Sequence, residues 1–347
     1  MGGTEPAYSL VLEALRRGKH VVTANKNIIA EHGDVVFAEA ARMNRFVGFR
    51  GTFVGCHSLL HDLGNRVKEG RITQITAILN GTCNYILSSM TEKQMDFSAA
   101  LEEAQDKGFA EKDPSMDIDG IDTAQKLKIL LGVTTNTRKV TEAFPVKGIR
   151  NISLQDVRYA AELGYRIKLL GLIQVRDSGI YAQVSPALVK SSSLLATAQR
   201  EANAIEVVDE FGKTSGLIAP GAGRYPTAQA ILKDIAEIVQ GSGLPMPQTD
   251  QPVKLSNPDE LSQRFYLCFT VADRPGVLAQ ISTVFWQFSI SVAAVVQKES
   301  VLQESPGIVP LVMLLHPAPE KDVRAALEKI DGSPVVKAPT QALHIYD

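Results

Sequence analysis

The sequence predicts a fold of the α/β and α+β classes, made of a partial doubly wound α/β domain, a mixed-sheet domain and a ferredoxin-like βαββαβ domain. Three observations support this prediction. Helix and strand patterns alternate over residues 4–43, two strand patterns follow each other at 165–175 and 180–186, and residues 264–347 give the order strand, helix, strand, strand, helix, strand. The first pattern is typical of a doubly wound sheet and the last of a ferredoxin-like domain.

The N-terminal residues predict half of the doubly wound domain. Thr4 is suited to cap a helix that ends before Gly18, and the β-branched run at 20–24 predicts a short buried strand. A second helix is expected at 26–43. Because no strand pattern comes before the first helix, we expect the chain to begin in the middle of this domain.

The rest of the chain alternates between strand and helix patterns up to a linker. The expected elements, in order, are a strand at 72–79, a turn at 80–82 followed by two helices, a loop at 111–119, a helix at 121–131, a short strand at 150–152, a helix at 154–163 between Ser153 and Gly164, paired strands at 165–175 and 180–186, and a helix at 226–239. Residues 241–258 are rich in glycine, proline and aspartate, which predicts a linker.

The composition limits the class of protein. With 36 Lys and Arg against 38 Asp and Glu, the net charge of -2 offers no basic field for nucleic acid or an anionic membrane, so a small-molecule enzyme fits better. Cys56, Cys83 and Cys268 are too few and too scattered for a disulfide framework, and no transmembrane or signal-peptide pattern is present. His57 and His61 have no third metal ligand nearby. We therefore expect a cytoplasmic protein without a metal site.

The strongest chemical signal lies in the segment EKDPSMDIDGIDTAQK at 111–126. Asp122 and Lys126 stand at i and i+4 on the expected helix, so the carboxylate can orient the ammonium. On spacing alone, the commoner outcome is a solvent-exposed ion pair worth about 0.3–0.5 kcal/mol. The acidic residues around it would repel one another unless a cation or a substrate ammonium lies among them; they are Glu111, Asp113, Asp117 and Asp119. The segment thus suits a carbonyl reductase with an amino-acid substrate.

Two further signals are weaker. Thr23-Ala24-Asn25-Lys26 follows the buried strand, and ligands of open α/β sheets bind at that end, so Lys26 is expected to face the crevice. An ordinary capping turn with a solvated lysine explains the same residues equally well. Asn80-Gly81-Thr82 offers backbone N–H groups and a hydroxyl at a helix start, where a substrate carboxylate can bind. Such a turn alone is weak support for a site.

Taken in order, VVTANK, LNGTCNYIL, AEKDPSMDIDGIDTAQKLKIL, YRIKLL and PGAGRYPTAQAILKD resemble homoserine dehydrogenase over nearly the whole chain. The resemblance implies NAD(P)H-dependent reduction of aspartate 4-semialdehyde to homoserine, in the biosynthesis of threonine, methionine and isoleucine. It implies that Lys126 and Lys26 transfer protons and that Asp122 orients Lys126. The implied substrate contacts are Glu111, Asp117, Thr82, Gly81 and Asn80, and the implied contacts of the NADP or NAD cofactor are Thr23, Lys26, Gly2, Gly3, Gly221 and Gly223.

The resemblance also implies a division of the chain. Residues 1–48 would be the C-terminal part of a Rossmann-like NAD(P)-binding domain, 49–219 the catalytic and dimerisation domain, 220–245 a helix returning to the first domain, and 246–260 a linker. Within 261–347, FTVADRPGVLAQIS resembles an ACT regulatory domain, in which Asp273, Pro275 and Gly276 would contact an amino-acid effector, expected to be threonine. A domain that only dimerises is the alternative. A dimer or tetramer of identical chains is expected.

The sequence departs from the family pattern in three ways. The G-x-G-x-x-G turn that would hold the cofactor pyrophosphate is not found, and with it goes the residue that would choose NAD or NADP. In addition, Arg50 stands where the family has a glutamate, and Val54 and Ser58 replace a glycine and a proline. The monovalent-cation site that the family usually forms at 48–60 is therefore not supported by these residues.

Two other interpretations stay open. A cofactor-deficient amino-acid-sensing or assembly subunit of the same family is favoured by the absent glycine-rich turn. The intact set of Lys26, Glu111, Asp122 and Lys126 favours the dehydrogenase instead. A hydroxy-acid dehydrogenase with an ACT domain is the third interpretation, but its Arg/His/Glu set is not found in this order.

Overall fold

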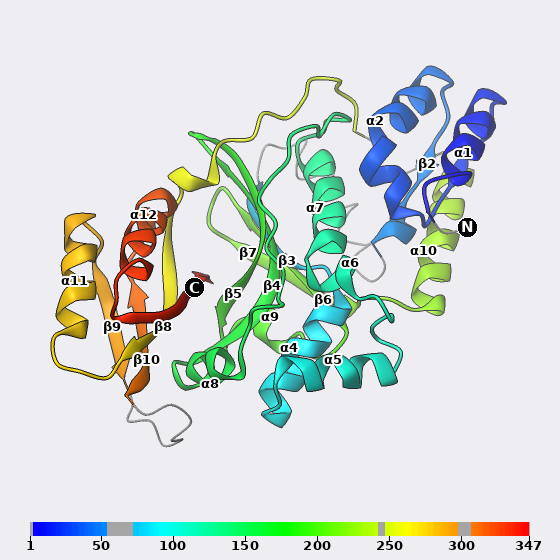
Figure 1. The fold of residues 1–347 in the computed structure, drawn as a ribbon. Helices are drawn as coiled ribbons and strands as arrows, with labels where there is room; N and C mark the ends of the chain where they lie inside the picture. Colours follow the sequence, from blue (N-terminus) through cyan, green and yellow to red (C-terminus); the bar gives the residue numbers. More distant parts are fainter. Residues whose placement is uncertain (1–2, 54–71, 242–246, 298–306, 347) are drawn as a thin grey trace. The chain divides into compact units, whose positions relative to one another are not determined.

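The computed structural model describes residues 3–53, 72–241, 247–297 and 307–346, which form two compact units (Figure 1). The first unit comprises Met1–Arg150, Lys168–Ser185 and Ser192–Ser256, and the second comprises Asn151–Ile167, Pro186–Ser191 and Asn257–Asp347. Helices and strands alternate through both units, so the predicted mixed α/β class is confirmed.

The first unit begins with a small α/β layer around a parallel pair of strands. Its elements are α1 (Ala7–Arg16), β1 (Val21–Val22), α2 (Lys26–Arg42), β2 (Val47–Gly48) and the single 3₁₀ turn η1 (Arg50–Thr52). The predicted cap at Thr4 is wrong, because the helix begins after Pro6 without a side-chain cap and the Thr4 hydroxyl donates to Glu31 instead. The start of α2 is confirmed: the Asn25 side chain accepts the backbone N–H of Ile28.

Helix α10 (Arg224–Val239) packs against β1, β2 and η1, although these elements lie far from it in the sequence (Figure 1). A Cβ atom at Gly48 would lie 2.6 Å from the Cβ of Asp234, which shows how closely the helix approaches the strand. The Arg50 side chain is fully buried here, with Nη1 2.6 Å from Asp234 and Nη2 2.6 Å from Glu237. Where a cation-binding glutamate was expected, the chain therefore buries a guanidinium between two carboxylates. Val54, Cys56, His57, Ser58 and His61 lie outside the described residues.

The central sheet of the first unit has the strand order β7-β6-β3-β4-β5, and β6 pairs antiparallel with β7. The strands are β3 (Ile72–Ile78), β4 (Tyr165–Arg176), β5 (Gly179–Lys190), β6 (Ala202–Asp209) and β7 (Thr214–Pro220), and residues 165–167 of β4 and 186–190 of β5 belong to the second unit. β3 pairs antiparallel with both β4 and β6. The sequence analysis predicted β3, β4 and β5 but missed the β6–β7 hairpin and the short helix α9 (Leu194–Thr197).

The helices next to this sheet bring the acidic segment onto it. They are α4 (Gly81–Lys93), α5 (Phe97–Asp106), α6 (Ser115–Ile118) and α7 (Ile121–Thr134). α4 contacts β6, and Leu127 of α7 lies 3.0 Å from where a Cβ of Gly171 in β4 would be. The predicted loop at 111–119 is wrong in part, since it contains α6, and α7 extends one turn beyond the expected end. Residues 150–152 form a turn rather than a strand.

The second unit contains a four-stranded antiparallel sheet in the order β12-β8-β10-β9. Its elements are α8 (Leu154–Glu162), η2 (Pro258–Glu260), β8 (Ser262–Ala272), α11 (Val277–Gln287), β9 (Val292–Gln297), β10 (Ile308–Leu315), β11 (Ala318–Pro319), α12 (Glu320–Asp331) and β12 (Val336–Tyr346). The predicted βαββαβ order is therefore confirmed, with α11 and α12 packed together on the apolar core of the sheet. Residues 344–346 of β12 pair in parallel with 187–189 of β5. The Ser153 capping box of α8 is confirmed.

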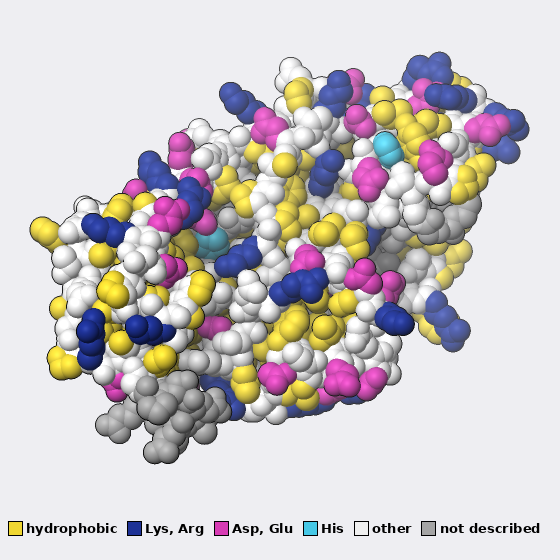
Figure 2. Space-filling view, in the orientation of Figure 1, with side chains coloured by type: hydrophobic (Ala, Val, Ile, Leu, Met, Phe, Trp, Pro, Cys, Tyr) yellow, Lys and Arg dark blue, Asp and Glu magenta, His cyan; other side chains and the backbone are white. Residues whose placement is uncertain are grey.

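The surface carries mixed charge. In Figure 2, basic and acidic side chains are interspersed, and neither sign dominates the face shown. Among the described residues, no helix combines the length and the apolar character needed to cross a bilayer.

Candidate active site

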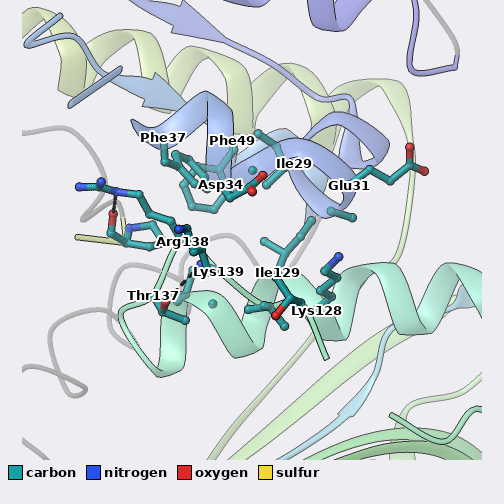
Figure 3. Close-up of a pocket in the computed structure, with 17 residues that line it drawn as sticks. Ile29, Glu31, Asp34, Phe37, Phe49, Lys128, Ile129, Thr137, Arg138 and Lys139 are labelled. Carbon is teal, nitrogen blue, oxygen red and sulfur yellow. Dashed lines mark hydrogen bonds between the residues drawn. The ribbon is translucent and has the colours of Figure 1, made fainter. Parts of the chain in front are cut away.

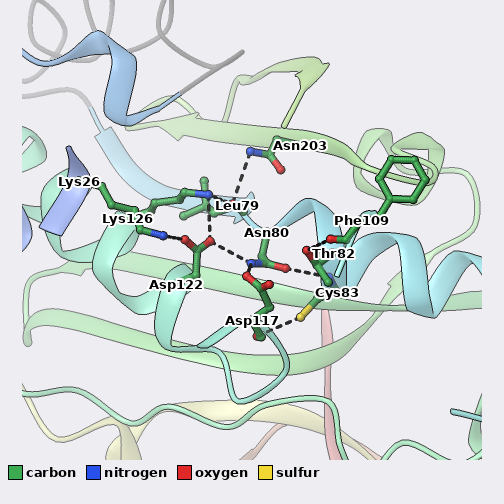
Figure 4. A network of polar contacts seen from close by, with 10 residues as sticks. All are labelled: Lys26, Leu79, Asn80, Thr82, Cys83, Phe109, Asp117, Asp122, Lys126 and Asn203. Atoms are coloured by element: carbon green, nitrogen blue, oxygen red, sulfur yellow. Dashed lines mark hydrogen bonds and ion pairs between the residues drawn. The ribbon is translucent and has the colours of Figure 1, made fainter. Parts of the chain in front are cut away.

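The Asp122 carboxylate lies between two lysines at the start of α7 (Figure 4). Its Oδ1 forms an ion pair with Nζ of Lys26, which comes from the first turn of α2, and its Oδ2 lies 2.9 Å from Nζ of Lys126. Asp122 is 4% exposed, whereas the Lys26 side chain is 30% exposed, so the carboxylate is buried and the Lys26 side of the site is open to solvent. The structure thus brings together all three residues that were expected to act in catalysis.

Asn80 connects this aspartate to a second carboxylate. Its Nδ2 donates to Asp117 at 2.6 Å and to Asp122 at 2.9 Å, while its Oδ1 accepts the backbone N–H of Cys83 and so caps α4. The Cys83 thiol donates to the Asp117 carbonyl, and burial raises its pKa well above the ordinary value, so it stays a neutral thiol. Asn80 is therefore a bridging residue as well as part of the predicted turn.

The ammonium of Lys126 is fixed on a second side by the protein backbone. Its Nζ donates to the carbonyl of Leu79, the last residue before the Asn80 turn, at 2.6 Å. Lys126 is therefore held by α7 and by the end of β3 together.

The acidity of Lys26 is shifted toward neutral pH. Burial and, next, the positive charge of Lys126 lower its pKa from 10.5 to about 8, although Asp117 and Glu111 act in the opposite direction. A lysine with a pKa of this size exchanges protons near neutral pH, as a general acid or base requires.

Two predicted substrate contacts differ in how they are placed. Glu111 is exposed, and its charge acts on Lys26, so it belongs to the same cluster. The Thr82 hydroxyl donates to the carbonyl of Phe109 at 2.7 Å, so its proton is already engaged. At this turn the backbone N–H groups of Gly81 and Thr82, at the start of α4, are the donors that suit a carboxylate.

The expected cofactor contacts lie in two places, at the end of β1 and before the start of α10. The Thr23 hydroxyl accepts the N–H of Asn25 at 3.0 Å, and Nδ2 of Asn25 donates to the Gly3 carbonyl at 2.7 Å. Gly223 has a φ of 130° and precedes the first residue of α10. Gly2 lies outside the described residues.

The backbone carbonyl of Glu201 lies between the turn at Gly81 and the turn at Gly221. A Cβ at Gly81 would lie 2.8 Å from the Glu201 carbonyl oxygen, and a Cβ at Gly221 would lie 2.7 Å from the same atom. Gly221 also approaches Oδ1 of Asn203, a buried oxygen without a hydrogen-bond partner in the described part of the chain. Neither Glu201 nor Asn203 was predicted, because β6, which begins directly after Glu201, was not predicted and a backbone carbonyl leaves no residue-type signal.

The expected effector contacts lie in the second unit, in the exposed turn between β8 and α11. The backbone N–H of Asp273 donates to the Gly307 carbonyl at 2.8 Å, and Gly276 has a φ of 90° directly before α11. Asp273, Pro275 and Gly276 are all exposed. These residues therefore form a turn between a strand and a helix, and their contact with an effector stays a prediction.

Comparison with known proteins gives a consistent result. The family model described as homoserine dehydrogenase matches residues 59–236. A homoserine dehydrogenase from Pseudomonas aeruginosa is 35% identical over 99% of this chain and 82% of its own length. The crystal structure of a homoserine dehydrogenase from Thiobacillus denitrificans matches with a TM-score of 0.91 and 35% identity, over 100% of this chain and 81% of that one. A hyperthermophilic archaeal homoserine dehydrogenase in complex with NADPH matches with a TM-score of 0.58 and 27% identity, over 70% of each chain. This chain therefore belongs to the homoserine dehydrogenase family.

Proposed function

We propose that the chain reduces aspartate 4-semialdehyde to homoserine at the Asp122 site, with NADPH or NADH as the reductant. The observation that carries this assignment is the buried Asp122 carboxylate held between Lys26 and Lys126. Carbonyl reduction needs a proton for the oxygen that becomes an alkoxide, and two ammonium groups beside one carboxylate supply and stabilise that proton.

The substrate binds by its two charged ends. Its α-ammonium is received by the carboxylates of Glu111 and Asp117, and its α-carboxylate by the free N–H groups of Gly81 and Thr82 at the start of α4. This leaves the aldehyde oxygen facing the lysines. The hydride adds to the aldehyde carbon, the C=O π bond breaks, and the oxygen takes a proton from Lys26, which Lys126 and Asp122 help to position.

The residues at the cofactor end fit a nicotinamide ring. A bound NAD(P)H supplies the hydride. Thr23, Gly3, Gly221 and Gly223 would provide the contacts. The Oδ1 of buried Asn203, which has no hydrogen-bond partner among the described residues, would accept from a carboxamide N–H group beside Gly221.

We further propose that the parts of the chain have the roles that the family resemblance implies. Residues 1–48 and 220–245 serve the cofactor, 49–219 carry catalysis and dimer contacts, and 246–260 link these to the regulatory part. Residues 261–347 act as an ACT domain that binds an amino acid, with threonine as the expected effector at Asp273. Strand β9 supports pairing with a second copy, since among the described residues it is bonded to β10 alone.

A comparison of two aldehydes tests the active-site assignment. Aspartate 4-semialdehyde and succinic semialdehyde differ in the ammonium group, so oxidation of NADPH is expected to be faster with the first by roughly 10²-fold or more in kcat/KM. Asp117→Asn should reduce this preference. Equal rates with both aldehydes would rule out the ammonium contacts.

Sedimentation and thermal unfolding of the full chain, each with and without L-threonine, test the regulatory part. We expect a dimer or tetramer and a threonine-dependent change in thermal stability that Asp273→Asn abolishes. A monomer with no response to threonine would remove this assignment and leave the active-site proposal intact.

A further inference from the structure

A cavity of about 270 Å³ opens between α2, α7 and residues 137–141, all within the first unit (Figure 3). Its floor is apolar and buried, and consists of Ile29, Phe37, Phe49, Ile129, Val133 and Val140. Drug-sized ligands occupy cavities of roughly 300–1,000 Å³, so this one suits a smaller molecule with an apolar body.

Opposite charges stand on different walls of this cavity. α2 contributes the carboxylate of Asp34, α7 the ammonium of Lys128, and the segment after α7 the ammonium of Lys139. In Figure 3, Asp34 and Lys128 extend from their helices toward the space between them. Within the described residues, none of these three side chains has a hydrogen-bond or ion-pair partner. A ligand that carries both charges would therefore satisfy both walls at once.

The cavity lies on the two helices that carry the active-site lysines and aspartate. On α2, Lys26 is followed at helical spacing by Ile29, Gly33 and Phe37; on α7, Asp122 and Lys126 are followed by Ile129 and Val133. The first turns of α2 and α7 contribute Lys26 and Asp122 to the ion pair, and the following turns of both helices line the cavity. α2 also leaves helical geometry at His32, beside the cavity, with φ -128° and ψ 18°.

We propose that this cavity binds a free α-amino acid with an apolar side chain of about the size of leucine. Its ammonium pairs with Asp34, its carboxylate with Lys128, and its side chain covers the apolar floor. The ligand also changes turnover, because it packs between the helices that set the Lys26–Asp122 distance. This second effect rests on the active-site proposal above.

Calorimetric titration of the full chain with L-leucine tests binding directly. Two analogues test the recognition of both charges: 4-methylpentanoate lacks the ammonium and 3-methylbutylamine lacks the carboxylate. L-leucine is expected to bind, and each analogue to bind about tenfold or more weakly. No heat and no thermal shift with L-leucine up to about 10 mM, a concentration that fills even a millimolar site, would overturn the proposal.

Matched variants separate this cavity from the turn at Asp273. Asp34→Asn and Lys128→Met should each weaken L-leucine binding about tenfold or more, while the exposed controls Asp177→Asn and Lys213→Met should not. L-leucine should change kcat/KM about fivefold or more in the unaltered chain and in Asp273→Asn, but not in Asp34→Asn. Binding that survives Asp34→Asn and is lost in Asp273→Asn would place the ligand elsewhere and overturn the proposal. Calorimetric binding of L-leucine is measured without NADPH, so it can be interpreted even if the active-site assignment fails.

Discussion

Nζ of Lys126 lies 2.9 Å from Oδ2 of Asp122, one turn earlier on the same helix. The other oxygen of this carboxylate is already paired with Lys26, so one negative charge serves two ammonium groups. Such a triad keeps an excess positive charge when both lysines are protonated. Loss of one proton relieves that excess, which accounts for part of the lowered pKa of Lys26.

Replacing Asp122 by asparagine should lower turnover more than it changes binding. The Asp122→Asn change would keep the side-chain volume but remove the charge that holds both lysines, so kcat for reduction should fall by roughly 10²–10⁴-fold. Steady-state kinetics with aspartate 4-semialdehyde measures the effect. Asp177→Asn, in the exposed turn between β4 and β5, is the matched control and should leave kcat unchanged. An unaltered kcat in Asp122→Asn would remove this residue from the proton-transfer assignment.

The reaction should depend on pH through Lys26. Its pKa is about 8, and reduction needs the protonated form, so kcat for reduction should fall as pH rises through about 8. Oxidation of homoserine needs the neutral form and should rise over the same range. In Lys126→Met the neighbouring positive charge is gone, so the pKa of Lys26 should rise. The pH profiles of reduction and of oxidation should then both shift to higher pH.

An independent measurement is available for the same prediction. Reductive methylation of Lys26, followed by mass spectrometry against pH, reports its free amine without turnover. A modification profile with its midpoint near 10.5, the ordinary pKa of a lysine, would contradict the assigned pKa of Lys26.

Removing one partner of the buried Arg50 cluster should destabilise the first unit. Burial raises the pKa of Asp234 even though the Arg50 hydrogen bonds lower it, which reflects how costly this charge is to bury. Asp234→Asn would leave the buried guanidinium with Glu237 alone, at an expected cost of about 3–5 kcal/mol. Urea unfolding measures this free energy. Glu13→Gln, which removes an exposed pair with Arg17, should change it little. Equal midpoints for both variants would refute the structural role.

Adding a methyl group at either glycine next to Glu201 should disturb the active site. Alanine at position 81 or 221 would place Cβ within 2.8 Å of the Glu201 carbonyl oxygen, so one turn must shift. A displacement of this size should lower kcat/KM by roughly 10–10²-fold. The control is Ala222→Ser, an exposed position in the same turn as Gly221. Full activity in both alanine variants would show that the turns tolerate the shift.

Much of the fold was predictable because hydrophobic periodicity, capping residues and turn glycines are local signals. Ser153 and Gly164 have the predicted roles at the ends of α8, and Asn25 caps α2 as the capping-turn alternative had it. Thr4 is not the cap of α1, because its hydroxyl donates to Glu31 of α2. Lys26 and Asp122 are 96 positions apart, so residue types and a family resemblance suggested their common site, and tertiary contacts determine the ion pair itself. The roles of Asn80 as a bridge and of the Glu201 carbonyl as a spacer depend on the packing of separate elements, which no local pattern encodes.

The Glu201 carbonyl also bears on how this enzyme can change over time. Because a main-chain atom sets the gap between the Gly81 and Gly221 turns, exchanging the side chain at 201 leaves that gap as it is. Insertion or deletion of a residue in the segment 198–203 would alter it. Laboratory evolution toward longer aldehydes should therefore recover length changes in that segment more readily than point substitutions at position 201.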